Sequence, residues 1–235
     1  MDKPFIQEAF AKVPPTYERI NHILTLGLDI VWRRRAVRQA AAGGGTRWAD
    51  LCSGTGETAA YLVRLALPNT EVCAVDFSEP MLAVARRKPE AVRMRFVLAD
   101  IQALPFDDGS MDLLTMSFAA RNINLSPEAF LLALREFHRV LKPGGRFVLL
   151  ETSQPRWSLV RRLRNGYVRL LVAAIGGGLS GQRAAYAYLA QSIPRFHAPE
   201  VLADLLRTAG FARVSFRRLL LGAAAIHEAV KGVSA

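Results

Sequence analysis

Hydrophobic runs alternate with amphipathic stretches along most of this chain. Because strands that alternate with helices pair in parallel and are covered on both faces, this pattern predicts an α/β fold with a doubly wound, Rossmann-like sheet. The predicted strands are residues 48–51, 71–76, 94–99, 111–118 and 146–151, and the helices between them are about residues 58–67, 80–88 and 126–141.

The last of these helices has a clear start. Ser126 is a preferred N-cap residue, Pro127 fits the first helical position, and Glu128 suits the positive end of the helix dipole. The stretch Pro143-Gly144-Gly145 is predicted to end it.

Helical segments are expected on both sides of the alternating region. Residues 1–45 form a predicted helical N-terminal segment with a break at Pro14-Pro15, and residues 152–197 form a mostly helical, substrate-side insertion. A helix at residues 199–208 and β-prone runs at residues 213–219 and 223–230 close the chain. No linker sets off a second unit, so residues 1–235 are predicted to form a single domain.

Composition excludes two broad classes. With 51% hydrophobic and 22% charged residues, the chain is globular and not disordered. The longest apolar run, residues 170–179, has about half of the ~20 residues that a membrane span needs. The first ten residues carry two acids and lack a signal-peptide core, and the two cysteines lie outside any paired motif. We therefore expect a cytoplasmic protein, free or peripheral on the inner face of the cell membrane.

The first strand ends in a glycine loop, DLCSGTG at residues 50–56. Gly54 and Gly56 allow a tight turn and a close approach of the backbone to a ligand. Twenty residues beyond Gly56, the second strand ends in Asp76, whose carboxylate can accept hydrogen bonds from both hydroxyls of a ribose. A nucleoside-containing cofactor is the prediction.

Two cofactors compete for this loop, because Gly54-x-Gly56-x-x-Ala59 also fits the dinucleotide fingerprint. Asp50 separates them. It ends the strand directly beneath the loop, where it would repel a pyrophosphate but favour the ammonium and sulfonium groups of S-adenosylmethionine. A Walker-type phosphate loop is excluded because no Gly-Lys-Ser/Thr follows the glycines.

The next two strands support S-adenosylmethionine. Asp100 ends the third strand and can accept the adenine amino hydrogen, while Ile101 can pack on the ring. Ser117 ends the fourth strand at the same rim. Since carboxyl ends of parallel strands share one edge of a sheet, Asp50, Asp76 and Asp100 are expected together there. We predict S-adenosylmethionine as cofactor and S-adenosylhomocysteine as its product.

Several motifs resemble those of class I methyltransferases, and more narrowly of the ubiquinone/menaquinone biosynthesis C-methyltransferase family. The stretch SFAARNI at residues 117–123 looks like that family's Ser-Phe-Gly-Leu-Arg-Asn-Val signature. Together the matching segments cover nearly the whole chain. They also include Phe10, Val13, Tyr17 and Asn21, residues 26–33 (LGLDIVWR), residues 141–145 (LKPGG) and residues 186–193 (YAYLAQSI).

The resemblance implies roles for individual residues. Arg121 and Asn122 are expected beside the reacting ring, and Tyr17 near the substrate as a catalytic residue. Tyr188 and His197 lie in the insertion and are expected to face the substrate. The residues implied or predicted to bind the cofactor are Asp50, Gly54, Thr55, Gly56, Asp76, Phe77, Asp100, Ile101 and Ser117.

This sequence departs from the family in a few places. Ser53 stands where the family usually has glycine, and Glu57 where it often has aspartate. On the substrate side, Glu18 and His22 replace common aspartates and His197 a usual proline. These departures leave the cofactor prediction intact and weaken the choice of quinol.

The implied reaction is methylation of an aromatic carbon beside a phenolic hydroxyl. Loss of the phenol proton makes the ring carbon nucleophilic, and the protein must align it with the methyl group. Since a guanidinium stays protonated, Arg121 would stabilise the phenolate or orient a water that takes the proton; a structural salt bridge is its alternative role. Demethylmenaquinol is the favoured acceptor, and a 2-methoxy-6-polyprenyl-benzoquinol or another small molecule are the alternatives.

A net charge of +11 indicates either an anionic binding partner or an ordinary solvated surface. In residues 156–169 arginines alternate with aromatic and aliphatic residues, as in helices that lie in an anionic membrane interface. A solvated helix over the sheet is the alternative. Nucleic-acid methylation and a non-enzymatic S-adenosylmethionine-binding module are weaker explanations, and no nucleic-acid partner is expected. No histidine spacing predicts a metal, and the oligomeric state stays open, with a homodimer as one candidate.

Overall fold

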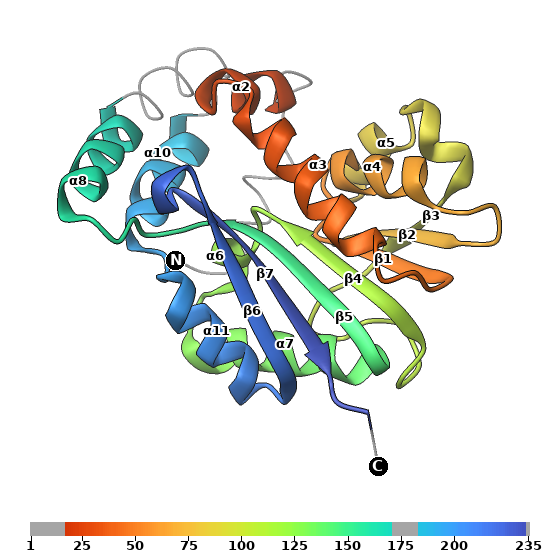
Figure 1. Ribbon diagram of the computed structural model, residues 1–235. Coiled ribbons are helices and arrows are strands. Elements are labelled where there is room, and N and C mark those ends of the chain that lie inside the picture. Colours follow the sequence, from red (N-terminus) through yellow and green to blue (C-terminus); the bar gives the residue numbers. More distant parts are fainter. Residues whose placement is uncertain (1–16, 171–182, 234–235) are drawn as a thin grey trace.

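The computed structural model describes residues 17–170 and 183–233, and seven strands of this part form one mixed sheet in the order β3-β2-β1-β4-β5-β7-β6 (Figure 1). All five predicted strands are present, and the two β-prone runs near the end are strands as well. The strands are β1 (Arg47–Leu51), β2 (Glu71–Asp76), β3 (Met94–Leu98), β4 (Met111–Ser117), β5 (Leu141–Thr152), β6 (Phe211–Leu219) and β7 (Ala224–Lys231).

The sheet is parallel from β1 to β5 only. β7 pairs antiparallel with β5, and β6 pairs antiparallel with β7. The reason is local, because only the short 3-10 turn η4 (Leu220–Gly222) and one further residue join β6 to β7, which is too short for the crossover that a parallel pair requires. The expectation of a parallel sheet is therefore corrected at its last two strands.

β5 begins earlier than predicted. The helix α7 (Pro127–Val140) ends immediately before it, and Leu141 already pairs with Met111 of β4. The next pair joins Leu113 to Arg146, so residues 142–145 form an irregularity in the strand and do not precede it. Gly144, at φ +77°, provides the left-handed backbone that this irregularity needs. The predicted cap is confirmed, since the Ser126 hydroxyl accepts the backbone N–H of Ala129 at 3.1 Å.

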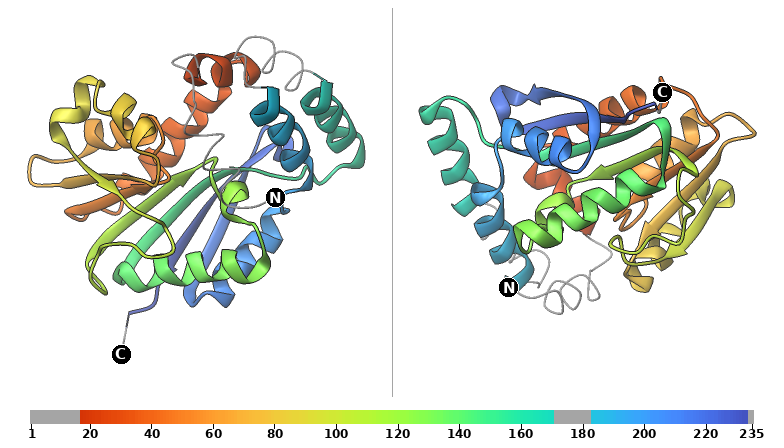
Figure 2. Two further views of the ribbon diagram at one scale, coloured as in Figure 1. Left: turned by 180° about the vertical axis from the view of Figure 1, so that it is seen from behind. Right: turned by 90° about the horizontal axis from the view of Figure 1, so that it is seen from below.

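Helices cover both faces of the sheet (Figure 2). The strand period of two sends neighbouring side chains to opposite faces. Trp48 accordingly joins the buried cluster beneath α3 (Leu28–Ala41) and α4 (Glu57–Leu65), whereas Ala49 and Leu51 join the cluster beneath α7 and α11 (Pro199–Thr208). The remaining elements of this region are α5 (Glu79–Ala85), η1 (Pro89–Arg93) and α6 (Ala120–Ile123).

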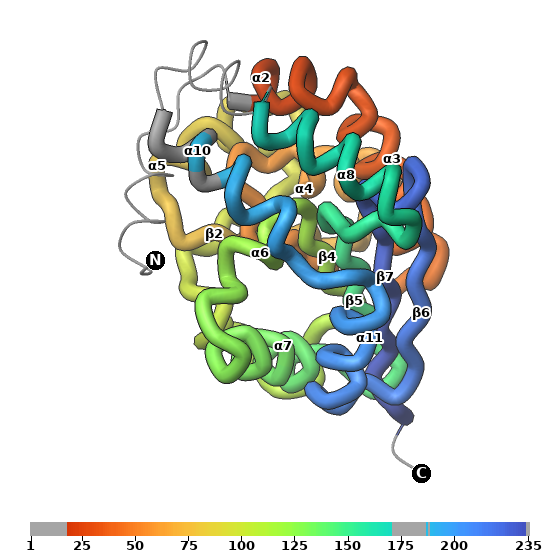
Figure 3. The backbone as a smooth tube through the Cα atoms, turned by 90° about the vertical axis from the view of Figure 1, so that its left-hand side faces the viewer, coloured from red at the N-terminus to blue at the C-terminus, as the bar shows by residue number. Residues whose placement is uncertain are grey.

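The N-terminal segment and the insertion meet at one end of the molecule (Figure 3). α2 (Tyr17–Leu24), α8 (Ser158–Tyr167), α10 (Arg183–Ser192) and η3 (Ile193–Arg195) lie there. Ile20 and Leu24 of α2 form a small buried cluster with Val168 and Leu189. The predicted break at Pro14-Pro15 lies outside the described residues. None of the described helices combines the length and hydropathy that crossing a membrane requires.

Candidate active site

A cavity of about 750 Å³ lies where β1, β2 and β4 end, and residues of α2, α3 and α8 line it from the other side. Two residues in the cavity wall have a strained backbone. Cys52, after β1, has φ +51°, and Phe118, after β4, has φ +59°. Non-glycine residues in this region cost about 1–3 kcal/mol and gather at functional sites. The predicted edge of the sheet is therefore the edge that carries the cavity.

The two glycines of the loop after β1 have different roles. Gly54 lines the cavity with φ +55°, and a Cβ there would meet no protein atom within 4 Å, so it would project into open space. Gly56 does not line the cavity. A Cβ at Gly56 would come within 2.8 Å of the Ala85 Cβ, so this glycine lets the start of α4 pack closely on α5. Thr55 lines the cavity between them.

Asp76 lines the cavity and also holds the glycine loop in place. Its Oδ2 accepts the backbone N–H of Gly54 at 2.8 Å, and its Oδ1 accepts that of Ser78 at 2.9 Å. Burial raises the pKa of this carboxyl, and the backbone N–H groups oppose that rise. The predicted ribose-binding carboxylate is thus fixed in orientation, and Phe77 beside it is at the cavity wall.

The ends of the next strands complete this side of the cavity. Asp100 lies at the wall, where its Oδ1 accepts the backbone N–H of Gln102 at 3.1 Å. Ile101 and Ser117 line the cavity as well. The structure therefore brings together Gly54, Thr55, Asp76, Phe77, Asp100, Ile101 and Ser117 of the predicted cofactor residues.

Asp50 is placed differently from the prediction. It is 1% exposed and does not line the cavity, and its Oδ1 accepts the hydroxyl hydrogen of Thr115 at 2.7 Å. Burial raises the pKa of Asp50 to about 7, so the carboxyl is not a fixed negative charge at neutral pH. Asp50 therefore does not disfavour a pyrophosphate by its charge, and other acids would have to do so. The cavity supplies them, because Glu18, Asp29, Glu57, Asp76 and Asp100 all line it.

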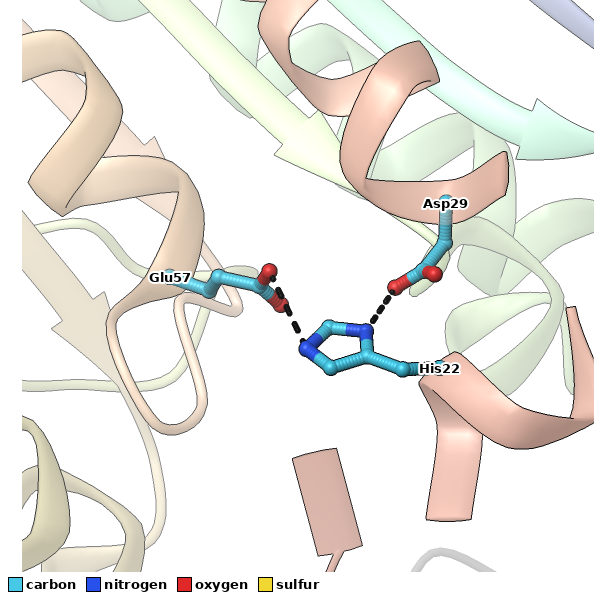
Figure 4. Close-up of side chains that lie close together, drawn as sticks. All are labelled: His22, Asp29 and Glu57. Atoms are coloured by element: carbon cyan, nitrogen blue, oxygen red, sulfur yellow. Dashed lines mark hydrogen bonds and ion pairs between the residues drawn. The ribbon is translucent and has the colours of Figure 1, made fainter. Parts of the chain in front are cut away.

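A cluster of His22, Asp29 and Glu57 joins the N-terminal segment to the start of α4 (Figure 4). The His22 Nδ1–H donates to the Asp29 Oδ2 at 2.8 Å, and the Nε2 lies 3.7 Å from a Glu57 carboxylate oxygen. Asp29 also accepts the hydroxyl hydrogen of Thr25 at 2.5 Å. Burial raises the pKa of Glu57, while Arg33 and His22 oppose the rise. Sequence spacing did not reveal this cluster, because its members come from α2, α3 and α4.

Arg33 is the cation of this cluster. Its Nε lies 3.3 Å from a Glu57 oxygen and 4.0 Å from an Asp29 oxygen, and its Nη1 donates to the Thr58 hydroxyl at 2.9 Å. The guanidinium also lies over the Phe118 ring, 5.0 Å from its centroid. The sequence predicts no metal site, yet these three side chains are metal-ligating types within reach of one ion. Arg33 supplies a positive charge beside the two carboxylates.

Arg121 and Asn122 both line the cavity, as the resemblance implied. The Arg121 Nη1 donates to Glu151 at 3.0 Å and to the Phe118 carbonyl at 3.1 Å. Glu151 is 1% exposed, so the structural salt bridge weighed as the alternative role is present, and it orients a cavity residue. The Asn122 Oδ1 is buried and has no hydrogen-bond partner among the described residues.

The other predicted substrate residues are less well placed. The structure places the backbone of Tyr17 in α2 and that of Tyr188 in α10, but it does not describe their side chains. His197 does not line the cavity. Its Nε2 accepts the Asn124 amide at 2.9 Å and its ring stacks on Phe130, so it packs beside α7 and not toward a ligand in the cavity.

The residues present fit S-adenosylmethionine. The Gly54 backbone leaves open space, Asp76 and Asp100 suit ribose and adenine, and the acids with Arg33 suit an ammonium and a carboxylate. The other part of the same cavity is apolar. Its lining includes Leu24, Leu26, Leu28, Trp32, Ile123, Leu125, Val160, Leu163, Val168, Leu189, Ile193, Leu220 and Leu221.

Comparisons with known proteins agree with this geometry. The model of the ubiE/COQ5 methyltransferase family matches residues 1–231. A demethylmenaquinone methyltransferase of Thermus thermophilus is 42% identical over 220 residues, which cover 93% of this chain and 97% of the relative. The ubiquinone/menaquinone biosynthesis C-methyltransferase UbiE of Desulfotalea psychrophila is 35% identical, with 97% and 91% covered. The fold is similar to that of a SAM-dependent methyltransferase of Thermotoga maritima, a possible histamine N-methyltransferase (TM-score 0.65, 19% identity, 96% and 99% covered).

Proposed function

The chain belongs to the ubiE/COQ5 methyltransferase family, so it is an S-adenosylmethionine-dependent methyltransferase, and we propose that its acceptor is the ring carbon of demethylmenaquinol. One observation carries the acceptor class. A single cavity combines acidic strand ends that fit the cofactor with an apolar lining that fits a lipophilic ring. A polyprenyl benzoquinol is the second candidate, because a relative's name includes ubiquinone.

S-adenosylmethionine, when bound, supplies an electrophilic methyl group. The protein's part is to exclude water, hold the ring and stabilise the negative charge that develops when the phenol loses its proton. Correct alignment of the two reacting atoms lowers the barrier by several kcal/mol. The apolar lining strengthens every charge interaction inside the cavity because it lowers the local dielectric constant.

Arg121 and Asn122 are suited to bind the quinol oxygen next to the reacting carbon. The Glu151 carboxylate fixes the Arg121 guanidinium, which stays protonated and stabilises a phenolate without acting as the base. The Asn122 Oδ1 has no partner in the part of the chain that the structure describes, so it can accept the quinol hydroxyl hydrogen. The proton then leaves through a water or through one of the carboxylates that line the cavity.

The test is to incubate the protein with labelled S-adenosylmethionine and a panel of reduced naphthoquinols and benzoquinols. The label should appear on the ring carbon of demethylmenaquinol and more slowly, or not at all, on the benzoquinol. Asn122→Ala should lower turnover by roughly tenfold with unchanged cofactor affinity, as expected for the loss of one hydrogen bond between the neutral amide and the neutral quinol hydroxyl. No methylated product from any quinol would refute the proposal.

Asn122 is a better test than Arg121. Arg121→Ala would leave Glu151 buried without a counter-ion, a loss that costs about 3–5 kcal/mol of stability and would obscure any catalytic effect. The control is Asp107→Asn, which changes an exposed side chain outside the cavity and should leave turnover unchanged.

The mouth of the cavity suits peripheral binding to an anionic membrane, from which such a quinol would enter. Four leucines line the cavity and are also exposed by 56–80%, and we refer to Leu26, Leu163, Leu220 and Leu221 as the apolar rim. Leu220 and Leu221 are held at positive φ, +42° and +54°, so this exposure is built into a strained turn.

Exposed basic and aromatic residues lie in and just before α8, the helix that contributes Leu163 to the apolar rim. Trp157 and Leu159 at the start of α8 are 61% and 65% exposed. The guanidinium groups of Arg156, Arg161 and Arg162 are on the exposed face of the same segment. Each basic residue near an anionic lipid surface contributes about 1 kcal/mol to binding. An anionic membrane surface is the partner that this combination favours.

A further inference from the structure

Arg164 differs from the other arginines of α8. Arg161 and Arg162 are exposed, whereas Arg164 is largely buried and lines the cavity. The helical period explains the difference, because Val160, Leu163, Arg164 and Tyr167 share the cavity-facing side of α8. The sequence presents these arginines as one basic group, and only the packing separates this one.

No carboxylate pairs with Arg164 within the described part of the chain. Its Nη2 donates to the Ser153 carbonyl oxygen, its Nη1 donates to the Ile193 carbonyl at 3.4 Å, and its buried Nε has no acceptor. The other two arginines in the cavity wall, Arg33 and Arg121, both pair with acids. Burial alone lowers the pKa of Arg164 to about 10, and no acidic group opposes it.

A buried cation without a counter-ion is costly unless something compensates its charge. The Nε–H of Arg164 is a buried donor without an acceptor among the described residues, and it lies in a cavity wall that is largely apolar. Both observations are explained if the compensating oxygen belongs to the ligand of the cavity.

We propose that Arg164 binds a ring oxygen of the quinol acceptor, the one on the opposite side of the ring from Arg121 and Asn122. This inference rests on the proposed function. Both guanidinium groups line the cavity and are anchored near the end of β5, Arg121 on the Glu151 carboxylate and Arg164 on the carbonyl oxygen of Ser153, just after the strand. A hydroquinone carries its two oxygens at opposite ends of the ring, so two separate cationic groups in one cavity wall suit it.

The proposed contact orients the ring and takes no part in bond making. The oxygen at Arg121 and Asn122 is next to the reacting carbon and conjugates with it directly. The far oxygen is held by Arg164, so the ring carbon is directed toward the methyl group. Arg164 is therefore a substrate-binding residue that selects acceptors with two ring oxygens.

The test combines a change in the protein with a change in the acceptor. Arg164→Gln, Arg164→Lys and the exposed control Arg213→Gln are assayed with a short-chain naphthoquinol in detergent, which removes any effect of membrane binding. The second acceptor is the matching naphthol, which keeps the hydroxyl next to the reacting carbon and lacks the far oxygen. Melting temperatures and S-adenosylmethionine affinity are measured for every variant.

With the quinol, Arg164→Gln should lower kcat/KM by roughly 10- to 100-fold, mostly through KM, since a hydrogen bond from a charged donor is lost. With the naphthol, wild type and Arg164→Gln should agree within about twofold. Arg164→Lys should keep part of the preference for the quinol, and Arg213→Gln all of it.

Three outcomes overturn the assignment. Equal losses with both acceptors would mean that Arg164 only supports the fold, and lost cofactor affinity would place it at the other end of the cavity. An unchanged kcat/KM with the quinol would mean that it contacts no far oxygen. A wild-type protein that neither methylates nor binds any quinol would instead refute the proposed function, and the assignment with it.

Discussion

Asp50 shows how burial changes the chemistry of a single carboxyl. It is held by the Thr115 hydroxyl, and Arg33 lowers its pKa, yet burial outweighs both and raises the pKa to about 7. The folded protein therefore holds a proton on Asp50 that the unfolded chain releases near pH 4.

Asp50→Asn should flatten the pH dependence of stability. The contribution of Asp50 to stability is complete below about pH 4, where folded and unfolded states are both protonated, and it is lost as the pH rises through about 7. The stability of Asp50→Asn relative to wild type should therefore rise by the order of 2 kcal/mol between pH 5 and 8. Urea denaturation of the ligand-free protein measures this, and Asp107→Asn, at an exposed position, is the control. Parallel pH profiles would contradict the buried, protonated carboxyl.

At the scale of elements, α2 depends on charged contacts to stay over the cofactor loop. It has only eight residues, and a helix of that length is marginal without tertiary contacts. Glu18 pairs with Lys88 at 2.8 Å, and His22 connects Asp29 to Glu57. These contacts hold the N-terminal segment against the loop after β1 and the region after α5.

His22→Ala should loosen α2 and weaken cofactor binding. The substitution removes the donor that faces the Oδ2 of the buried Asp29, so we expect roughly tenfold weaker S-adenosylmethionine binding by calorimetry. Amides of residues 17–24 should also exchange faster with deuterium. Arg19→Ala changes an exposed side chain of the same helix and is the matched control. If the two variants behave alike, the cluster does not hold the segment.

At the scale of the whole molecule, the exposed leucines of the apolar rim come from separate parts of the chain and line one cavity. α2, α8 and the turn between β6 and β7 all contribute residues to the cavity lining, and these elements lie away from the C-terminus (Figure 1). This arrangement would let the protein rest on a bilayer with the cavity open to it, and no helix of the described part would have to cross the membrane.

Vesicle flotation tests this orientation. Wild type should float with anionic vesicles and much less with neutral ones, since both apolar insertion and basic residues contribute. Trp157→Ala/Leu159→Ala should lower the bound fraction at limiting lipid by roughly tenfold. Val92→Ala, at a 92% exposed position on η1, removes apolar surface elsewhere and should not. Absence of wild type from both kinds of vesicle would remove the membrane from the proposal.

Local patterns in the chain predict the helices and strands and most of the cavity residues that fit the cofactor. The cap at Ser126, the strands β1, β2 and β4 and the glycine loop depend on residues close in the chain. Because parallel strands end at one edge, Asp76, Asp100 and Ser117 could also be placed together without coordinates. Arg121 and Asn122 followed from resemblance, and they do line the cavity.

Which charged side chains face the cavity depends on packing and cannot be predicted from the sequence pattern. Asp50 and Asp76 look alike in sequence, but packing buries the first beneath the wall and leaves the second in it. Glu57 meets His22 across 35 residues, and Arg164 turns inward while its helical neighbours stay exposed. Burial and charge environment depend on contacts between segments distant in the chain, and a one-dimensional pattern carries no record of them.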